Sequence, residues 1–416
     1  MVKQPDESEH VMQMRPANPE TIRTASIAWS THSSEQAAQG AASAARKRVL
    51  IIQEHLPHYR VPFFEQLRYL LDERSIHLDL AYSAGGTSKL LTGSLPWARA
   101  VPTARWMGLV YQHVIRLATK ADLVIVPQEV KYVSLAWLFA RRATSRMKLA
   151  FWGHGRNMQA RNRNSWPEKA KRFLSARVDW WFAYNERSAV VVRELGFPAD
   201  HITLVDNAID TKTLIAARNA LSLETIESTK ASLGIDSANV AIYTGGLYAE
   251  KRIPFLMEAA TKVRNKLPDF HLIVIGGGPQ ADLVKEAGRS HNWLHYVGPK
   301  NDSEKLPYWA ASKVSLIPGA VGLGVLDAFA LGAPLITSRT FGHGPEIAYL
   351  KPGINGVMVE QGESSSDYAT AVVDLLKDDE KRTKMIHAGR LECSTLNIET
   401  MARNFADGIE AALRAD

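Results

Sequence analysis

The first half of the chain alternates short apolar runs with segments of helical spacing. Residues 49–52 form an apolar run rich in β-branched side chains, and residues 61–74 then place apolar side chains at intervals of three and four. The same alternation predicts further strands at residues 77–82, 122–126, 148–152 and 180–184. Strands separated by helices favour a parallel sheet that is covered by helices on both faces.

The pattern begins again near residue 239, which predicts a second domain of the same kind. Its predicted strands are residues 240–243, 271–275, 295–297, 314–317 and 334–337. Its predicted helices are residues 254–266, 280–290, 302–311 and 324–331. In doubly wound domains the ligand-bearing loops follow the carboxyl ends of the strands, so a cleft between the two domains is the expected binding site.

A length of 416 residues also suits two domains, and the pattern divides the chain into four segments. Residues 1–45 are polar and are expected to be a disordered N-terminal tail. Residues 46–210 and 211–395 are the two predicted domains. Residues 396–416 hold an amphipathic helix with Asn397 as its N-cap, and this helix is expected to pack back on the N-terminal domain.

The strongest local signal is the glycine-rich turn at residues 318–324, which follows a predicted strand and opens a helix at Gly324. Unpaired N–H groups at a helix start suit a phosphate or a sugar hydroxyl, and glycine lets a ligand approach the backbone closely. Asp327 falls near the end of the first helical turn, where its carboxylate can accept two ribose hydroxyls. The alternative is an ordinary strand-to-helix turn with an aspartate that interacts with the helix dipole.

Three other positions carry candidate chemistry, and each has a structural alternative. His154 ends a strand between two glycines, which favours a close approach to its backbone, but a buried structural histidine also fits. Lys251 follows a strand and a glycine turn, where a surface lysine is the alternative. Arg60 lies near a helix start, where it would either meet an acceptor phosphate or remain in a solvated loop.

In their order along the chain, these segments resemble retaining GT-B glycosyltransferases of family four, the glycosyl transferases group 1 type. The glycine-rich turn resembles the donor-binding signature of the family. Residues 243–252 resemble its Gly-Arg-Leu segment with a following lysine, and residues 272–279 resemble its strand ending in Gly-x-Gly-Pro. The resemblance implies an α/β GT-B fold, in which two Rossmann-like doubly wound domains face a cleft. The N-terminal domain would bind the acceptor, and the C-terminal domain would bind the nucleotide sugar.

The resemblance also implies roles for individual residues. It makes Asp327 the ribose ligand, Lys251 a cation that clamps the donor diphosphate, and His154 a neighbour of the transferred sugar, and these three are the predicted catalytic residues. The predicted donor-binding residues are Gly245, Gly246, Lys251, Arg252, Val297, Gly298, Gly322, Leu323, Gly324 and Asp327. The predicted acceptor-side residues, on the first loop, are His58, Tyr59 and Arg60.

Two positions depart from the family pattern. Gly319 stands where the family has the first of two glutamates, and Gly246 stands where it has the arginine of the diphosphate clamp. Arg252 would replace that arginine if its side chain turned inward. Asn207 and Glu346 match other segments of the family and are interpreted as structural residues.

The net charge of +7 is unevenly distributed. Residues 46–200 carry 25 Lys and Arg against 12 Asp and Glu, a net charge of +13, whereas residues 201–416 carry 22 against 26, a net charge of −4. A basic half attracts an anionic membrane surface or a pyrophosphate-linked acceptor, and a solvated basic surface is the alternative. No signature of an RNA- or DNA-binding module is present, so nucleic acid is not an expected partner.

The rest of the composition favours the cytoplasm. A single cysteine, Cys393, excludes an internal disulfide and a cysteine-based metal cluster. No apolar run reaches the roughly 18 residues of a spanning helix, and the start of the sequence lacks the apolar stretch of a secretory signal. We therefore expect a cytoplasmic protein that is peripheral to the inner face of the membrane if its basic half docks there.

The predicted function is transfer of a hexosyl group from a nucleoside-diphosphate sugar to a glycan or lipid-linked acceptor in polysaccharide or glycoconjugate biosynthesis. The resemblance implies retention of configuration, with no metal and no cofactor besides the donor. The departures at Gly319 and Gly246 keep open a catalytically silent nucleotide-sugar-binding protein, and the architecture keeps open a sugar-nucleotide epimerase. A nicotinamide dehydrogenase is less favoured, because Pro279 interrupts the glycine run and no acidic residue follows about 20 residues later.

Overall fold

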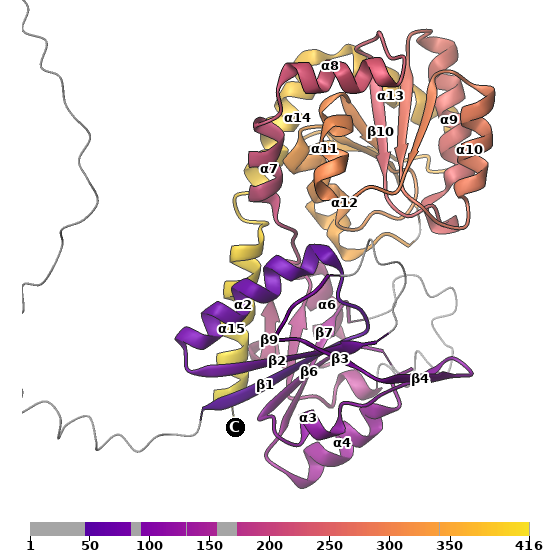
Figure 1. Ribbon diagram of the computed structural model, residues 1–416. Helices are drawn as coiled ribbons and strands as arrows, with labels where there is room; N and C mark the ends of the chain where they lie inside the picture. The colour runs from indigo at the N-terminus through magenta and orange to yellow at the C-terminus, as the bar shows by residue number, and fades with distance from the viewer. Residues whose placement is uncertain (1–45, 85–92, 130, 156–172, 341, 416) are drawn as a thin grey trace, which may run out of the picture. The chain divides into compact units, whose positions relative to one another are not determined.

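The computed structural model of the protein describes residues 46–84, 93–129, 131–155, 173–340 and 342–415 (Figure 1). The predicted tail at residues 1–45 lies outside the described residues.

The N-terminal half of the described chain forms a seven-stranded parallel sheet in the order β3-β2-β1-β6-β7-β8-β9. Its strands are β1 (Lys47–Gln53), β2 (Ile76–Ser83), β3 (Arg99–Val101), β6 (Leu123–Pro127), β7 (Lys148–Gly153), β8 (Trp180–Ala183) and β9 (Ile202–Leu204). Its helical segments are η1 (His58–Arg60), α2 (Val61–Glu73), α3 (Ile115–Ala118), α4 (Ser134–Thr144), α6 (Glu186–Glu194) and η3 (Ala199–His201). An antiparallel hairpin of β4 (Thr103–Trp106) and β5 (Leu109–Gln112) lies between β3 and α3.

The C-terminal half forms a six-stranded parallel sheet in the order β12-β11-β10-β13-β14-β15. Its strands are β10 (Val240–Thr244), β11 (His271–Ile275), β12 (Leu294–Gly298), β13 (Val314–Leu316), β14 (Leu335–Ser338) and β15 (Gly356–Val359). Its helical segments are α7 (Thr211–Asn219), α8 (Leu223–Ser232), η4 (Ala249–Lys251), α9 (Ile253–Lys266), α10 (Ala281–Ser290), α11 (Asp302–Ala310), α12 (Gly324–Leu331), η5 (Pro345–Tyr349), α13 (Ser365–Lys377), α14 (Asp379–Glu392) and α15 (Ile398–Arg414).

The two sheets have the same strand order, apart from the additional edge strand β9 in the first, which confirms the prediction of two doubly wound α/β units. The order reverses at β1 and β6 in the first sheet and at β10 and β13 in the second. Loops that leave neighbouring strands in opposite directions open a crevice at the carboxyl edge, and ligands of open α/β sheets bind there. The fold therefore directs attention to the loops after β1, β6, β10 and β13.

Each predicted strand has a counterpart in the structure, but short elements were missed. The prediction did not include β3, β9, β15 or the β4–β5 hairpin, which have only three or four residues each. Strands this short give little periodic signal, and β9 is only partly buried along its length. Residues 211–232, which follow the first predicted domain, form the helices α7 and α8.

The last helix, α15, packs on the N-terminal sheet by an aromatic cluster. The Asn397 side chain accepts the N–H of Thr400 and caps the helix, as the sequence predicts. The Phe405 ring stacks on Phe182 of β8 at 4.3 Å between ring centroids and meets Phe63 of α2 edge-on at 5.5 Å. The chain thus returns from its second sheet to cover the first one.

Among the described residues, no helix combines the length and the hydropathy that crossing a bilayer requires.

We predict that Phe405→Ala destabilises the fold by about 3–5 kcal/mol, because Phe405 is fully buried and its removal leaves a cavity between α15, α2 and β8. Urea denaturation of the purified protein measures the change. Arg403→Ala, an exposed position on the same helix, is the control and should leave the unfolding midpoint unchanged. Equal midpoints for the two variants would show that α15 does not stabilise the N-terminal sheet.

Candidate functional site

The loops after β10 and β13 meet at the reversal point of the C-terminal sheet. The ammonium group of Lys251, in η4, donates to the carbonyl oxygen of Ala320, and the Ala320 N–H donates to the Glu250 carbonyl at 2.8 Å. Burial lowers the pKa of Lys251, against the opposing effect of Glu346 and Glu250. Lys251 is therefore not a surface lysine, and its charge lies beside the glycine-rich turn.

The glycine-rich turn presents backbone donors at the start of α12. The N–H groups of Gly322, Leu323 and Gly324 have no hydrogen-bond acceptor among the described residues. The neighbouring Val321 N–H, in contrast, donates to Nδ1 of His343 at 3.1 Å. Amide groups left open in this way, on glycines that admit a close approach, suit the oxygens of a phosphate or a sugar.

Asp327 lies in the first turn of α12 and pairs with a lysine that sequence reasoning missed. Its Oδ1 lies 2.8 Å from Nζ of Lys305, and both side chains are mostly buried, at 17% and 12% exposed. Lys305 also contacts Asp302 at 2.7 Å. Burial acts to lower the pKa of Lys305, but Asp327 and Asp302 raise it above its ordinary value.

This ion-pair chain reaches the first loop of the N-terminal half. Nε2 of His58 lies 3.1 Å from Oδ2 of Asp302, and this hydrogen bond is the largest cause of the lowered pKa of Asp302. A predicted acceptor-side residue and a predicted donor-side residue are thus joined through Asp302 and Lys305. The pairing could not be found from the sequence, because 244 residues separate His58 from Asp302.

The structure explains both departures from the family pattern. A Cβ atom at Gly319 would lie 2.3 Å from the Glu250 carbonyl oxygen and 2.6 Å from the Lys251 Cα atom, so the backbone of η4 fills the place of a side chain. A Cβ atom at Gly246 would lie 2.2 Å from the ring of Tyr248. The place of the missing carboxylate is therefore filled by backbone atoms, and that of the missing arginine is covered by the half-exposed ring of Tyr248.

Arg252 does not supply the missing second cation in this structure. Its guanidinium donates to Ser338 Oγ at 3.1 Å and to the Gly362 carbonyl at 2.6 Å, and it pairs with Glu363 at 2.8 Å. Its carbon Cζ also lies 4.1 Å from the ring centroid of Phe255. These partners hold the side chain against the loops after β14 and β15, so the inward turn that Arg252 would need to replace the arginine is not observed.

The remaining donor-side glycines bring neighbouring loops together. A Cβ atom at Gly276 would lie 1.9 Å from the carbonyl oxygen of Gly245, and the N–H of Gly245 donates to Ile275 at 3.1 Å. Gly276 in turn donates to the carbonyl of Gly298, which follows the partly buried Val297 at the end of β12. The glycine run at 276–278 thus serves close loop packing, and it aligns the loops of three adjacent strands at one edge.

His154 lies at the end of β7, where the sequence places it, but its flanking glycines have a different cause from the predicted one. A Cβ atom at Gly153 would lie 3.3 Å from Cβ of Gln128, and one at Gly155 would lie 2.9 Å from two valine side chains of α6. The close approach is therefore made by protein side chains and does not by itself indicate a ligand. The His154 ring meets Tyr184 edge-on at 4.3 Å between centroids. Residues 156 and 157 of this segment lie outside the described residues.

A buried polar network connects the N-terminal half to the glycine-rich turn. Glu346 accepts a hydrogen bond from Nδ2 of Asn207 at 2.6 Å, and Oδ1 of Asn207 accepts from Arg60 at 2.5 Å. A Cβ atom at Gly322 would lie 3.9 Å from Oε2 of Glu346. Burial raises the pKa of Glu346 above its ordinary value. Hydrogen bonds from its own N–H and from Asn207 act to lower this pKa, as do the charges of Arg60 and Lys251.

This network shows that Arg60 of the first loop is a buried residue. Arg60 is only 7% exposed and also donates to the carbonyl oxygen of Ala208 at 3.2 Å, so the alternative of a solvated Arg60 is wrong. Its guanidinium is occupied by protein acceptors, and a role as a phosphate ligand has no support in this arrangement. Tyr59 and His58 of the same loop are half-buried.

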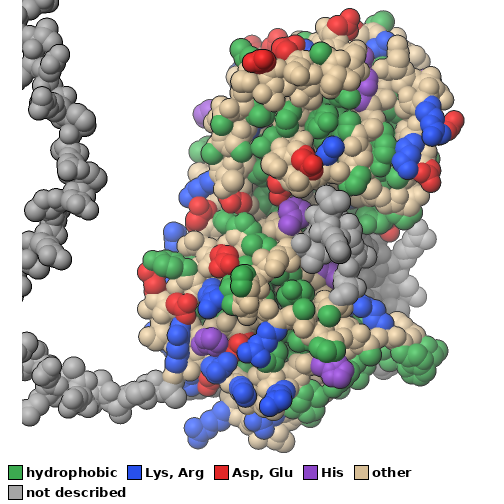
Figure 2. Space-filling view, viewed as in Figure 1, with side chains coloured by type: hydrophobic (Ala, Val, Ile, Leu, Met, Phe, Trp, Pro, Cys, Tyr) green, Lys and Arg blue, Asp and Glu red, His purple; other side chains and the backbone are tan. Residues whose placement is uncertain are grey.

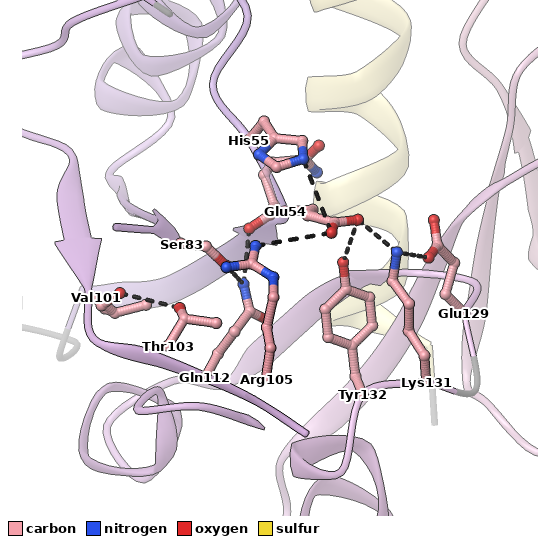
Figure 3. Close-up of polar contacts among 11 residues, drawn as sticks. Glu54, His55, Ser83, Val101, Thr103, Arg105, Gln112, Glu129, Lys131 and Tyr132 are labelled. Atoms are coloured by element: carbon pink, nitrogen blue, oxygen red, sulfur yellow. Dashed lines mark hydrogen bonds and ion pairs between the residues drawn. The ribbon is translucent and has the colours of Figure 1, made fainter. Parts of the chain in front are cut away.

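The reversal point of the N-terminal sheet holds a second charged cluster (Figure 3). The Glu54 carboxylate, just after β1, accepts from Nζ of Lys131 at 2.6 Å and from the Tyr132 hydroxyl at 2.9 Å, and Arg105 lies 3.9 Å away. Burial acts to raise the pKa of Glu54, but the bonds from Lys131 and Tyr132 lower it below its ordinary value. A pocket that Tyr132 and Glu129 help to line lies beside this cluster.

The Glu54 cluster was missed because its members come from separate segments. Glu54 follows β1, Arg105 belongs to β4, and Lys131 and Tyr132 follow β6. The only available signal was the position of these segments after strands that border the reversal point. Among the described residues, no group of three or more His, Cys, Asp or Glu side chains is arranged to hold a metal ion.

Comparison with known families agrees with this geometry. Residues 238–378 match the family model described as Glycosyl transferases group 1. This segment, called the group 1 segment below, is similar to the group 1 glycosyl transferases. It contains β10 to β15, the glycine-rich turn, Lys251, Lys305 and Asp327.

Relatives of the group 1 segment include enzymes of inositol and mannose chemistry. D-inositol 3-phosphate glycosyltransferase of Corynebacterium urealyticum is 27% identical over 196 residues, which are 44% of this chain and 45% of that protein. A GDP-mannose-dependent alpha-(1-6)-phosphatidylinositol monomannoside mannosyltransferase of Mycolicibacterium smegmatis is 29% identical over 170 residues, 38% of this chain and 44% of that protein. The matches span less than half the length of these curated relatives.

Solved structures share the whole fold at low sequence identity. Anabaena Alr3699/HepE in complex with UDP-glucose has a TM-score of 0.67 and 16% identity, over 88% of this chain and 99% of that one. Sucrose-phosphate synthase from Thermosynechococcus elongatus has a TM-score of 0.64 and 16% identity, over 88% and 98% of the two chains. The predicted GT-B fold is confirmed.

We predict that Gly319→Ala destabilises the protein by about 1–3 kcal/mol, because its methyl group overlaps the backbone of Glu250 and Lys251. Urea denaturation measures the loss. The control is Gly277→Ala, since a Cβ atom there would meet no atom closer than 3.9 Å and its backbone lies outside the left-handed region. Equal stability of the two variants would show that η4 can move away from Gly319.

Proposed function

We propose that this chain is a retaining, metal-independent hexosyltransferase that uses a nucleoside-diphosphate sugar. The observation that carries the proposal is the edge after β10 and β13, where Lys251 contacts the glycine-rich turn and the amides of Gly322–Gly324 are open at the start of α12, the helix that carries Asp327. A cation and helix N–H groups suit a diphosphate, and a carboxylate beside them suits the two hydroxyls of a ribose.

The group 1 segment supports a nucleotide sugar as the donor. A solved neighbour holds UDP-glucose, and the mannosyltransferase of Mycolicibacterium smegmatis is GDP-mannose-dependent. We propose a hexose as the transferred group on this basis. Val297 and Gly298, at the end of β12, are the proposed contacts of the nucleobase, and Gly245 and Gly246 line the diphosphate side.

In the proposed reaction, the acceptor hydroxyl attacks the anomeric carbon on the face from which the diphosphate departs. The leaving diphosphate takes the proton of that hydroxyl, and the bond from the anomeric carbon to the phosphate oxygen breaks. Lys251 and the amides of Gly322–Gly324 offset the charge that develops on the diphosphate, which a dry site makes more effective. His154 orients the transferred sugar.

We propose the N-terminal half as the acceptor side, with a glycan or lipid-linked acceptor. The loop of His58 and Tyr59 and the Glu54 cluster both follow β1, at the reversal point of this sheet. Arg60 then acts through Asn207 and Glu346 as a positioning residue. The buried Cys393 suits a reducing compartment, and we place the enzyme in the cytoplasm.

A catalytically silent nucleotide-sugar-binding protein is the second candidate. Gly319 and Gly246 leave the site without a carboxylate and a cation, and Arg252 is engaged elsewhere. Incubation with labelled nucleotide sugars and a glycan or lipid acceptor separates the alternatives. A labelled acceptor product supports the transferase, whereas donor binding without turnover supports the silent protein, and conversion of the donor sugar without an acceptor supports an epimerase.

We predict that Asp327→Asn raises the dissociation constant of UDP or GDP more than about tenfold, because hydrogen bonds to a charged group contribute about 1.5–3 kcal/mol. Isothermal titration calorimetry measures the constant. Asp302→Asn is a matched control, since both carboxylates contact Lys305, at 2.7 and 2.8 Å. The ribose role of Asp327 is wrong if both variants bind the nucleotide as the wild type does.

We predict that His154→Ala lowers kcat at least about tenfold, because the side chain that orients the transferred sugar by hydrogen bonding is lost. Steady-state kinetics with the donor and acceptor identified above measure the change. His113→Ala, an exposed histidine of the same half, is the control. Wild-type turnover in His154→Ala would remove this residue from the mechanism.

A further inference from the structure

The β4–β5 hairpin ends in an exposed apolar tip. Trp106, Met107 and Leu109 are 73%, 82% and 45% exposed. Figure 1 shows this hairpin projecting from the N-terminal half, and Figure 2 shows hydrophobic side chains gathered at the same place, at the lower right. Single exposed apolar residues are common on proteins, but several on one projecting turn mark an interaction surface.

The turn residues are not explained by the stability of the hairpin. Met107 and Gly108, between the two strands, have φ angles of 47° and 80°. Two-residue turns with positive φ at both central positions favour Asn-Gly, because asparagine tolerates the left-handed region better than other non-glycine residues. A Cβ atom at Gly108 would meet nothing within 4 Å, so the tip packs against no described part of the protein. A large apolar side chain at Met107 therefore has no role inside the fold.

The base of the hairpin is fixed to the domain, which makes the tip a rigid projection. Val110 is 5% exposed, its N–H donates to Lys131 at 2.9 Å, and its carbonyl accepts from Val133 at 2.9 Å. Trp106 pairs with Leu109 across the two strands, and directly opposed residues place their side chains on one face. Val133, beside the base, is itself 47% exposed.

The sequence that contains the hairpin is basic and carries no acidic residue. No Asp or Glu occurs between residues 80 and 121. The described residues of this stretch include four exposed cations, which are Arg99, Arg105, Arg116 and Lys120. An exposed apolar tip within a basic segment complements a surface that has anionic headgroups above an apolar layer.

We propose that this hairpin docks the protein on an anionic lipid bilayer, with Trp106, Met107 and Leu109 inserted among the headgroups and the four cations above them. Tryptophan favours the interface between water and hydrocarbon. The inference builds on the proposed function, since it names the surface where a lipid-linked acceptor would be met. Glu54, which contacts Arg105 on the same hairpin at 3.9 Å, links the docking element to the candidate acceptor side.

The test is flotation of the full chain with phosphatidylcholine vesicles, with and without phosphatidylglycerol. We expect binding to the anionic vesicles that salt weakens, and little binding to pure phosphatidylcholine. The double variant Trp106→Ser, Met107→Asn should lower the bound fraction at least about fivefold. Leu223→Ser is the control, because Leu223 is 81% exposed but lies on α8 of the other half, and it should bind as the wild type does.

Met107→Asn alone keeps the test valid if the double variant does not fold, since asparagine suits the left-handed turn. Equal binding of wild type and tip variants, or binding that ignores salt and anionic lipid, overturns the proposal. Self-association without lipid that the tip variants abolish would assign the tip to a second copy and also overturn it. Sugar transfer to a soluble acceptor is measured separately, without vesicles. Absence of this transfer activity would count against the proposed function and not against membrane docking.

Discussion

The hydrogen bond between Asn207 and Glu346 is the contact on which the geometry of the candidate site depends. It joins the segment after β9 to the segment after β14, and it lies in the protein interior with Arg60 on one side and Lys251 on the other. Breaking a buried charged network leaves polar groups without partners. The free-energy cost of those unpaired groups is larger than the net contribution of the intact network to stability. The position of the glycine-rich turn relative to the N-terminal half is therefore set by buried polar groups as well as by apolar packing.

The cations at the edge after β10 and β13 have protein partners. Lys251 donates to the Ala320 carbonyl, and Lys305 pairs with Asp327. A bound nucleotide would have to exchange these contacts for its own, so affinity would reflect the difference between two sets of hydrogen bonds. The same exchange would alter the contact between Asp302 and His58 of the first loop, because Asp302 contacts both His58 and Lys305.

The sequence predicted what is local and missed what depends on folding. The strands, the helix that starts at Gly324 and the cap at Asn397 follow from runs of neighbouring residues, and all three are confirmed. The pairing of Lys305 with Asp327 and the Glu54 cluster join separate segments, so no spacing in the sequence could indicate them. The glycines beside His154 show the opposite error, since a local signal for close approach was real but its partner was the protein itself.

The packing of η4 on Gly319 has a consequence for how this site can change over generations. A carboxylate at position 319 has no room unless the backbone of Glu250 and Lys251 first shifts, and that shift would also move the ammonium group that contacts Ala320. A direct change from glycine to glutamate at position 319 would thus cost stability unless η4 changed first. The residue at position 319 and the backbone of η4 are thus coupled, so a substitution in one loop is tolerated only together with a change in the other.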